Sequence, residues 1–116
     1  EEVKRIPKNI FEKYFSPVNG GDRFQIDYNL RCRVSYQKHN LLSLKPIKDD
    51  FCFVMCKNVL LHFTYEQRVD VIRMLHGALA PGGLLAMEQT QKMPDELTDY
   101  WMRLTNDGQV FSKIEV

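Results

Sequence analysis

Residues 51–63 read FCFVMCKNVLLHF, an apolar run that stops at two polar residues, Lys57 and Asn58, and then resumes. Six apolar or sulfur-bearing residues in a row, at positions 51–56, are typical of a parallel strand that is buried on both faces. Small ligands of open α/β sheets bind outside the carboxyl ends of the strands. We therefore expect a ligand site around Lys57, Asn58 and His62.

A helix and a second strand follow this run. Thr64 and Gln67 form the S/T-x-x-E/Q capping box that begins a helix, and an apolar stripe at helical spacing runs through residues 69–79. The Pro-Gly-Gly sequence at 81–83 is expected to end the helix, and the apolar residues 84–87 to form a strand. Strand, helix and strand in this order predict a right-handed crossover between parallel strands.

The N-terminal residues predict a helix and a small antiparallel β-subdomain. Apolar residues recur at three and four positions in 7–15, which indicates a short helix, and 16–22 are rich in turn formers. Residues 24–28 and 32–36 alternate apolar with polar side chains, the pattern of two half-buried strands.

The C-terminal residues predict a hairpin. Asp107-Gly108 lies between the runs 100–105 and 109–114, and Asp-Gly between alternating runs is a strong hairpin signal. Before it, Pro94 and the acidic residues that follow indicate a short helix or turn.

Composition excludes several classes of protein. The 116 residues are 44% hydrophobic and carry a net charge of +1 with scattered basic residues, a pattern that does not suggest binding to nucleic acid or to a membrane surface. No apolar run approaches the roughly 20 residues of a membrane span. The three cysteines are expected to be free thiols in a reducing compartment. We expect a soluble, cytoplasmic protein.

Metal and thiol chemistry are poorly supported. Cys52 and Cys56 would face the same side of a strand at a separation of about 13 Å, too far to bind one tetrahedral ion. No histidine is placed beside a thiol, so core packing is the preferred role of the cysteines and no metal site is expected. Gly20-Gly21 and Gly82-Gly83 lack the preceding strand and the further glycines of a nucleotide loop.

The polar residues at the predicted strand ends allow two interpretations. Asn40, Lys57, Asn58 and His62 carry hydrogen-bonding groups, and an Asn amide can pair with an adenine edge or an amino-acid head group. Alternatively, Asn58 pairs with loop backbone and His62 is an ordinary residue before a helix. The spacing alone leaves both interpretations open.

Two motifs carry a resemblance to a known family. The sequence CKNVLLHF at 56–63, followed by a helix and by LAPGGLL at 79–85, resembles the chemotaxis-receptor glutamate methyltransferases, the CheR family. Their pattern is C-R-N-V, two apolar residues and Y-F, with L-x-P-G-G after the helix. Residues 40–42 resemble the family's N-L-L element, and 6–15 and 108–111 resemble its flanking segments, so the resemblance covers nearly the whole chain.

The resemblance implies a fold and a chemistry. The fold would be α/β, a partial Rossmann-like methyltransferase sheet with a small antiparallel β-subdomain and a C-terminal hairpin. Residues 1–38 would form a helix and the β-subdomain, which in the family can dock a receptor tail by adding a strand. Residues 39–116 would be the C-terminal half of the methyltransferase domain. The implied reaction, part of chemotaxis signal transduction, esterifies receptor glutamates with S-adenosylmethionine.

The resemblance also assigns residues. His62 would take the place of the family tyrosine near the transferred methyl group, and would be the catalytic position. The adenosine end of the cofactor and the adjoining pocket would be contacted by Asn40, Leu41, Lys57, Asn58 and Val59.

This chain departs from the family pattern. Lys57 stands in place of Arg and loses a planar fork of donors, His62 replaces Tyr, and Glu-Gln-Thr-Gln at 88–91 replaces G-H-S-E. The Gly-rich cofactor loop and the ribose-binding acid of the family have no counterpart here, and the chain begins with Glu1. We therefore interpret the chain as a C-terminal portion with little or no activity by itself.

An alternative function is a diverged, non-catalytic binding module that docks a receptor or a signalling partner. An unpaired strand at 51–56 would be an aggregation hazard at a sheet edge. We expect another chain, as in a dimer, or further segments of a longer protein to cover it.

Overall fold

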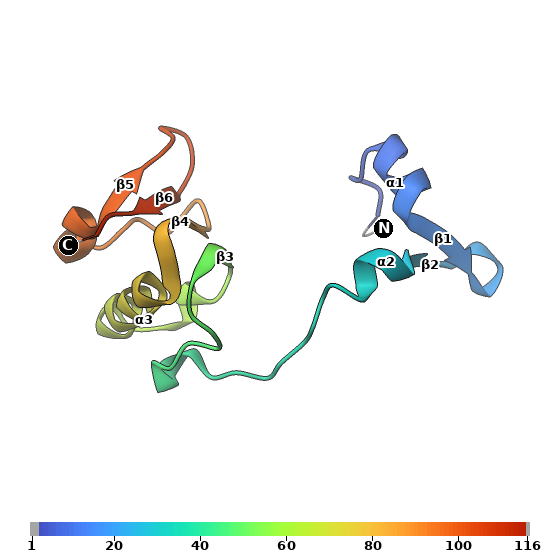
Figure 1. Cartoon of the computed structure of the whole chain (residues 1–116). Coiled ribbons are helices and arrows are strands. Elements are labelled where there is room, and N and C mark those ends of the chain that lie inside the picture. Colours follow the sequence, from blue (N-terminus) through green and yellow to red (C-terminus); the bar gives the residue numbers. More distant parts are fainter. Residues whose placement is uncertain (1–2, 116) are drawn as a thin grey trace. The chain divides into compact units, whose positions relative to one another are not determined.

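The computed structural model describes residues 3–115 and divides the chain into two compact units, Glu1–Lys38 and His39–Val116 (Figure 1). Each unit has its own sheet, and each is described by itself. The family resemblance assigns the first unit to a β-subdomain and the second to part of a methyltransferase domain; this assignment remains a proposal.

The first unit contains the predicted helix and an antiparallel pair of strands. Phe11 stacks on Phe15 at a ring-centroid distance of 5.1 Å and meets the edge of Phe24 at 4.8 Å, so an aromatic cluster joins the helix to the sheet. The elements are α1 (Lys8–Tyr14), β1 (Phe15–Val18), the 3-10 turn η1 (Asn19–Gly21), β2 (Arg23–Ile26) and α2 (Tyr28–Arg31).

One of the two strands that the alternation predicted is present, because β2 corresponds to the predicted strand at 24–28. β1 begins at Phe15, the last residue of the predicted helix, and otherwise lies within the stretch 16–22 predicted as a loop. Its Pro17 pairs with Phe24 of β2, because a strand with one neighbour tolerates a residue without a backbone donor. The predicted strand at 32–36 is wrong. The Asp27 carboxylate accepts a hydrogen bond from the Asn29 N–H at 3.2 Å and caps α2, which ends β2 and begins a helix instead.

The second unit contains a four-stranded sheet in the order β3-β4-β6-β5. β3 and β4 are parallel, whereas β6 is antiparallel to both of its neighbours. The strand-helix-strand prediction and the hairpin prediction are therefore both confirmed. The elements are η2 (Leu41–Ser43), β3 (Phe51–Cys56), η3 (Leu60–His62), α3 (Tyr65–Ala78), β4 (Leu79–Met87), η4 (Asp95–Tyr100), β5 (Trp101–Arg103) and β6 (Val110–Lys113).

α3 begins where its capping signal predicts. The Gln67 N–H donates to Thr64 Oγ1 at 3.2 Å, and the Thr64 N–H donates to Gln67 Oε1 at 2.9 Å, which completes the capping box. The buried face of α3 carries Val69, Ile72 and Leu75 and packs into a core that includes aromatic residues of the hairpin. Capping and periodicity together therefore determine the start and the buried face of this helix.

The end of α3 lies before the predicted Pro-Gly-Gly stop. The helix ends at Ala78, and Leu79 already pairs with Phe51 of β3, so residues 81–83 lie within β4 at a shift of register. A Cβ on Gly83 would lie 3.0 Å from the Phe51 carbonyl oxygen and 2.9 Å from that of Ala80. The glycine is required because backbone oxygens of the neighbouring strand and of β4 itself both approach it closely.

β3 differs from the prediction of a strand buried on both faces. It has one neighbour in the described sheet, and its side chains at Cys52, Phe53 and Met55 are exposed, whereas Cys56 is buried. The apolar run correctly predicts a strand, but the burial of a strand depends on what packs beside it. In this chain β3 is an edge strand.

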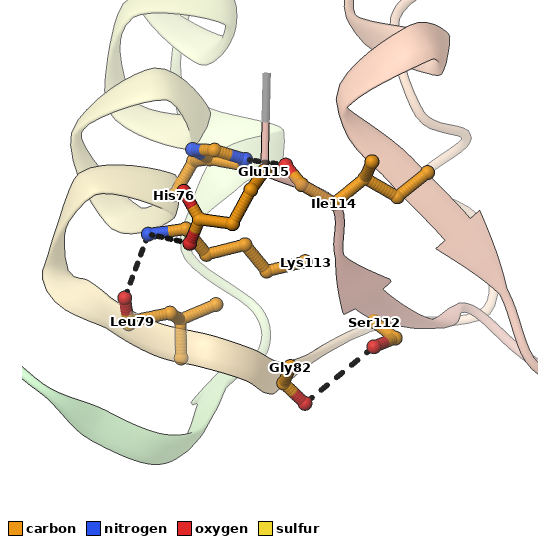
Figure 2. Close-up of polar contacts among 7 residues, drawn as sticks. All are labelled: His76, Leu79, Gly82, Ser112, Lys113, Ile114 and Glu115. Atoms are coloured by element: carbon orange, nitrogen blue, oxygen red, sulfur yellow. Dashed lines mark hydrogen bonds and ion pairs between the residues drawn. The ribbon is translucent and has the colours of Figure 1, made fainter.

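The hairpin is tied to the junction of α3 and β4 by polar contacts, which Figure 2 shows. Lys113 Nζ donates to the Leu79 carbonyl oxygen at 2.8 Å, and a ring nitrogen of His76 lies 3.0 Å from the Ile114 carbonyl oxygen. A cation beside the carbonyl groups at a helix C-terminus is stabilising. These contacts hold β6 against the strand-helix-strand unit.

Candidate functional site

A pocket of ≈ 310 Å³ lies beside the edge strand β3. Its lining residues come from β3, from α3, from the segment before β3 and from Lys57 and Val59, which follow the carboxyl end of the strand. The volume is near the lower limit of small-molecule sites, roughly 300–1,000 Å³. The pocket extends along β3 from Phe51 and reaches the carboxyl end of the strand at Lys57 and Val59, where ligands of α/β sheets bind.

Three of the six residues assigned by the resemblance line this pocket together. Leu41 enters from η2, and Lys57 and Val59 enter from the end of β3, so residues separated in sequence are neighbours here. Asn40, Asn58 and His62 are outside the lining. The structure thus brings together half of the predicted set.

Asn40 has a local structural role. Its side-chain oxygen accepts a hydrogen bond from the Leu42 N–H at 3.0 Å and caps η2. This contact holds the turn that carries Leu41 into the pocket. Asn40 therefore acts on the pocket through the backbone of its neighbours.

Asn58 turns the chain out of β3. Its φ of 61° lies in the left-handed region, and its backbone N–H donates to Glu88 Oε2 at 2.6 Å. Glu88 directly follows β4, so this hydrogen bond joins the carboxyl ends of the two parallel strands. This hydrogen bond involves only the main chain of Asn58, so both interpretations of its side chain stay open.

His62 ends the short turn η3 and is exposed. It lies outside the pocket lining, although only two residues separate it from Val59. An exposed imidazole at this position is accessible to a large partner.

Two buried polar atoms were missed by the sequence analysis. Glu88 is 6% exposed, and its buried Oε1 has no hydrogen-bond partner among the described residues. The buried Nε2 of His39, a residue that lines the pocket, also has no hydrogen-bond partner among them. Glu88 could have been found, because it follows an apolar strand as Lys57 does. His39 carried no comparable signal.

Cys56 lies in the low-dielectric part of the site. Burial raises the pKa of its thiol, and the negative charge of Glu88 raises it further. The thiol is therefore held in its neutral form and is a poor nucleophile. Cys52 is exposed, which corrects the expectation that both thiols of the run are buried.

The donor set of the pocket suits a ligand with a flat apolar portion and an anionic group. Its walls are mainly aliphatic and aromatic, Lys57 supplies an ammonium group, and His39 supplies an unpaired ring nitrogen. Across residues 3–115 no group of three or more His, Cys, Asp or Glu side chains is placed to hold a metal ion. Within the same residues no helix is long and apolar enough to cross a membrane.

Comparison with known proteins gives a family match over most of the chain. Residues 1–108 match the sequence model of the CheR methyltransferase, SAM binding domain. The chemotaxis protein methyltransferase Cher2 of Pseudomonas putida is 33% identical over 96 residues, which are 80% of this chain and 34% of that protein. Chemotaxis protein methyltransferase 1 of Pseudomonas aeruginosa is 34% identical over 87 residues, 72% of this chain and 31% of that protein.

More distant relatives carry similar names. A probable chemotaxis protein methyltransferase of Rhizobium etli is 26% identical over 96 residues, which cover 81% of this chain and 36% of that protein. The chain spans about a third of the length of the curated relatives that it matches.

Proposed function

This chain belongs to the CheR methyltransferase family, and from that premise we propose that it forms the C-terminal part of an enzyme that methylates glutamate side chains of a chemoreceptor-like protein. The methyl donor would be S-adenosylmethionine. The observation that carries this proposal is that Leu41, Lys57 and Val59 line one pocket that reaches the carboxyl end of β3.

The pocket suits part of S-adenosylmethionine. Its apolar walls suit the adenine ring, the unpaired Nε2 of His39 can bond to a polar edge, and the Lys57 ammonium can pair with the carboxylate of the methionine portion. None of the lining residues, all within the described part of the chain, is acidic. The ribose hydroxyls and the amino group of the cofactor therefore have no carboxylate partner here, which supports the proposal of a half-site.

The reaction needs alignment more than acid-base catalysis. When bound, S-adenosylmethionine supplies an activated methyl group on a sulfonium ion. A glutamate carboxylate is already ionised at neutral pH, so the protein has no proton to remove, and holding the reacting groups in line is the main task. His62 is the position that we propose beside them, and its exposure leaves it accessible to a protein substrate.

The first prediction concerns the isolated chain. We expect no methyl transfer to a chemoreceptor fragment and no binding of S-adenosylmethionine at micromolar concentration, because the ribose hydroxyls and the amino group of the cofactor lack carboxylate partners in this pocket. At millimolar cofactor, amide NMR shifts should appear at Leu41, Lys57 and Val59. Lys57→Met should reduce these shifts, and Lys92→Met, which is exposed and outside the pocket, should not.

Two results would contradict this proposal. Micromolar binding together with methyl transfer would show that the chain is a complete enzyme. An absence of shifts at the pocket residues in millimolar cofactor would remove the cofactor site.

The second candidate function is a binding module, and the open sheet edges favour it. β1 and β2 form a two-stranded sheet in which each strand has one described neighbour, and Phe24 and Ile26 are about 40% exposed. Such an edge can accept a receptor tail as an added strand. A tail peptide that shifts the amides of residues 15–26 in the absence of cofactor, with no response of the pocket to S-adenosylmethionine, would favour this function.

A further inference from the structure

Glu88 is a buried acid that the proposed reaction does not use. It lies where β4 ends, it is 6% exposed, and it reaches across to the end of β3, thirty residues earlier in sequence. Its Oε2 accepts the Asn58 N–H at 2.6 Å, and its Oε1 is buried without a hydrogen-bond partner. None of the ion pairs found among the described residues involves Glu88.

Packing does not explain a carboxylate at this position. Burial of a charge costs free energy unless the charge is paired, and Glu88 has one hydrogen bond for its two oxygens. An apolar side chain would continue the buried run of Leu85, Ala86 and Met87 without that cost. The contact with Asn58 is thus the feature that distinguishes Glu88 from an ordinary core residue.

That contact determines a backbone conformation. Asn58 has a φ of 61°, which is unfavourable for most residues other than glycine. A hydrogen bond from a backbone N–H to a carboxylate is roughly twice as strong as one between neutral groups. It holds the turn in which Lys57 and Val59, on either side of Asn58, both line the pocket.

We propose that Glu88 is a positioning residue that fixes the Lys57–Asn58 turn and so presents Lys57 and Val59 to the ligand of the pocket. The role of Glu88 in fixing this turn is inferred from the geometry alone. The identity of the ligand as S-adenosylmethionine rests on the proposed function.

The second prediction concerns the Asn58 amide and is tested by amide NMR on the full 116-residue chain. In Glu88→Ala we expect the Asn58 amide to exchange with solvent at least about tenfold faster, which corresponds to 1.4 kcal/mol, with its proton resonance moved upfield. Glu88→Gln keeps an acceptor but loses the charge, so the resonance should move upfield while slow exchange is retained. Glu66→Gln, an exposed acid of the same unit, should change neither.

A merely structural role would give a different pattern. If Glu88 only stabilised the fold, exchange would accelerate equally at Asn58 and at core amides such as Ile72 and Leu85, and the proposal would be overturned. An Asn58 resonance that does not move in Glu88→Gln would also overturn it, even if Glu88→Ala does not fold.

Cofactor shifts separate this proposal from the proposed function. With millimolar S-adenosylmethionine, the shifts at Lys57 and Val59 should be lost in Glu88→Ala and retained in Glu88→Gln. If the unmodified chain shows no such shifts, the proposed cofactor is wrong, whereas the Asn58 amide still decides whether Glu88 holds the turn.

Discussion

At the scale of single residues, Asn58 meets two demands at one position. Its φ of 61° requires a residue that tolerates the left-handed region, and Asn does so better than most non-glycine residues. Its N–H reaches Glu88, so the main chain of Asn58 has a structural function that is independent of any ligand. Whether its side chain also contacts a cofactor stays a prediction of the family resemblance.

The third prediction distinguishes the three thiols. Cys32 and Cys52 are exposed, whereas Cys56 is buried and its pKa is raised by burial and by the charge of Glu88. Iodoacetamide at pH 8 should therefore modify two cysteines of the folded chain and leave Cys56 intact, as measured by mass spectrometry of peptides. In urea all three should react, and modification of Cys56 at the rate of Cys32 in the folded chain would contradict the structure.

The same pKa shift has a consequence for stability. The pKa of Cys56 is higher in the folded chain than in the unfolded chain. The neutral thiol therefore makes its full contribution to the free energy of unfolding below the pKa of the unfolded chain, about 8.5. The contribution is lost as the pH rises through the folded value. The free energy of unfolding should accordingly decrease at alkaline pH, and less so in Cys56→Ala.

At the scale of elements, Gly83 explains the Pro-Gly-Gly sequence better than helix termination does. The fourth prediction is that Gly83→Ala lowers the free energy of unfolding by about 1–3 kcal/mol, because its Cβ would overlap backbone oxygens of Phe51 and Ala80. Urea unfolding followed by fluorescence of Trp101, the only tryptophan and a buried residue, would measure the change in the second unit.

A matched glycine is available six residues earlier. Gly77 lies within α3, and a Cβ there would meet no atom within 4 Å. Gly77→Ala should therefore stabilise the second unit by roughly 0.5–1 kcal/mol. Equal effects of the two substitutions would show that the space around Gly83 is not the cause.

At the scale of the whole molecule, the edge strand β3 is the most consequential feature. Phe53 is 46% exposed and Met55 is 64% exposed, and β3 has one described neighbour. An apolar strand of this kind offers unpaired backbone groups to another chain. We expect this edge to be covered when the protein acts, by a second copy or by further segments of a longer protein.

The fifth prediction tests that expectation. The isolated chain should self-associate, and Met55→Lys should shift it towards the monomer without loss of secondary structure, as measured by sedimentation and circular dichroism. Leu61→Lys replaces another exposed apolar residue, which lies outside the strands, and should have little effect. A stable monomer with β3 accessible to solvent would contradict the expectation.

The elements governed by local interactions could be predicted from the sequence. The capping box of Thr64 and Gln67 places the start of α3, and Asp107-Gly108 places the hairpin, because both signals act between residues close in sequence. The polar end of the 51–56 run also indicates one side of the pocket. The alternation at 32–36 wrongly predicted a strand. The structure has instead the short helix α2, which is capped by Asp27 and lies just before these residues.

Tertiary structure alone decided the features that depend on distant neighbours. The burial of β3 depends on what packs beside it, and the need for glycine at Gly83 comes partly from the carbonyl group of Phe51 on the neighbouring strand and partly from that of Ala80 in β4. The contact of Glu88 with Asn58 joins residues thirty positions apart, and no periodicity encodes such a distance. The sequence by itself therefore determined the family, the start of α3 and the C-terminal hairpin, and the packing of the sheet determined the shape of the pocket and the residues that hold it.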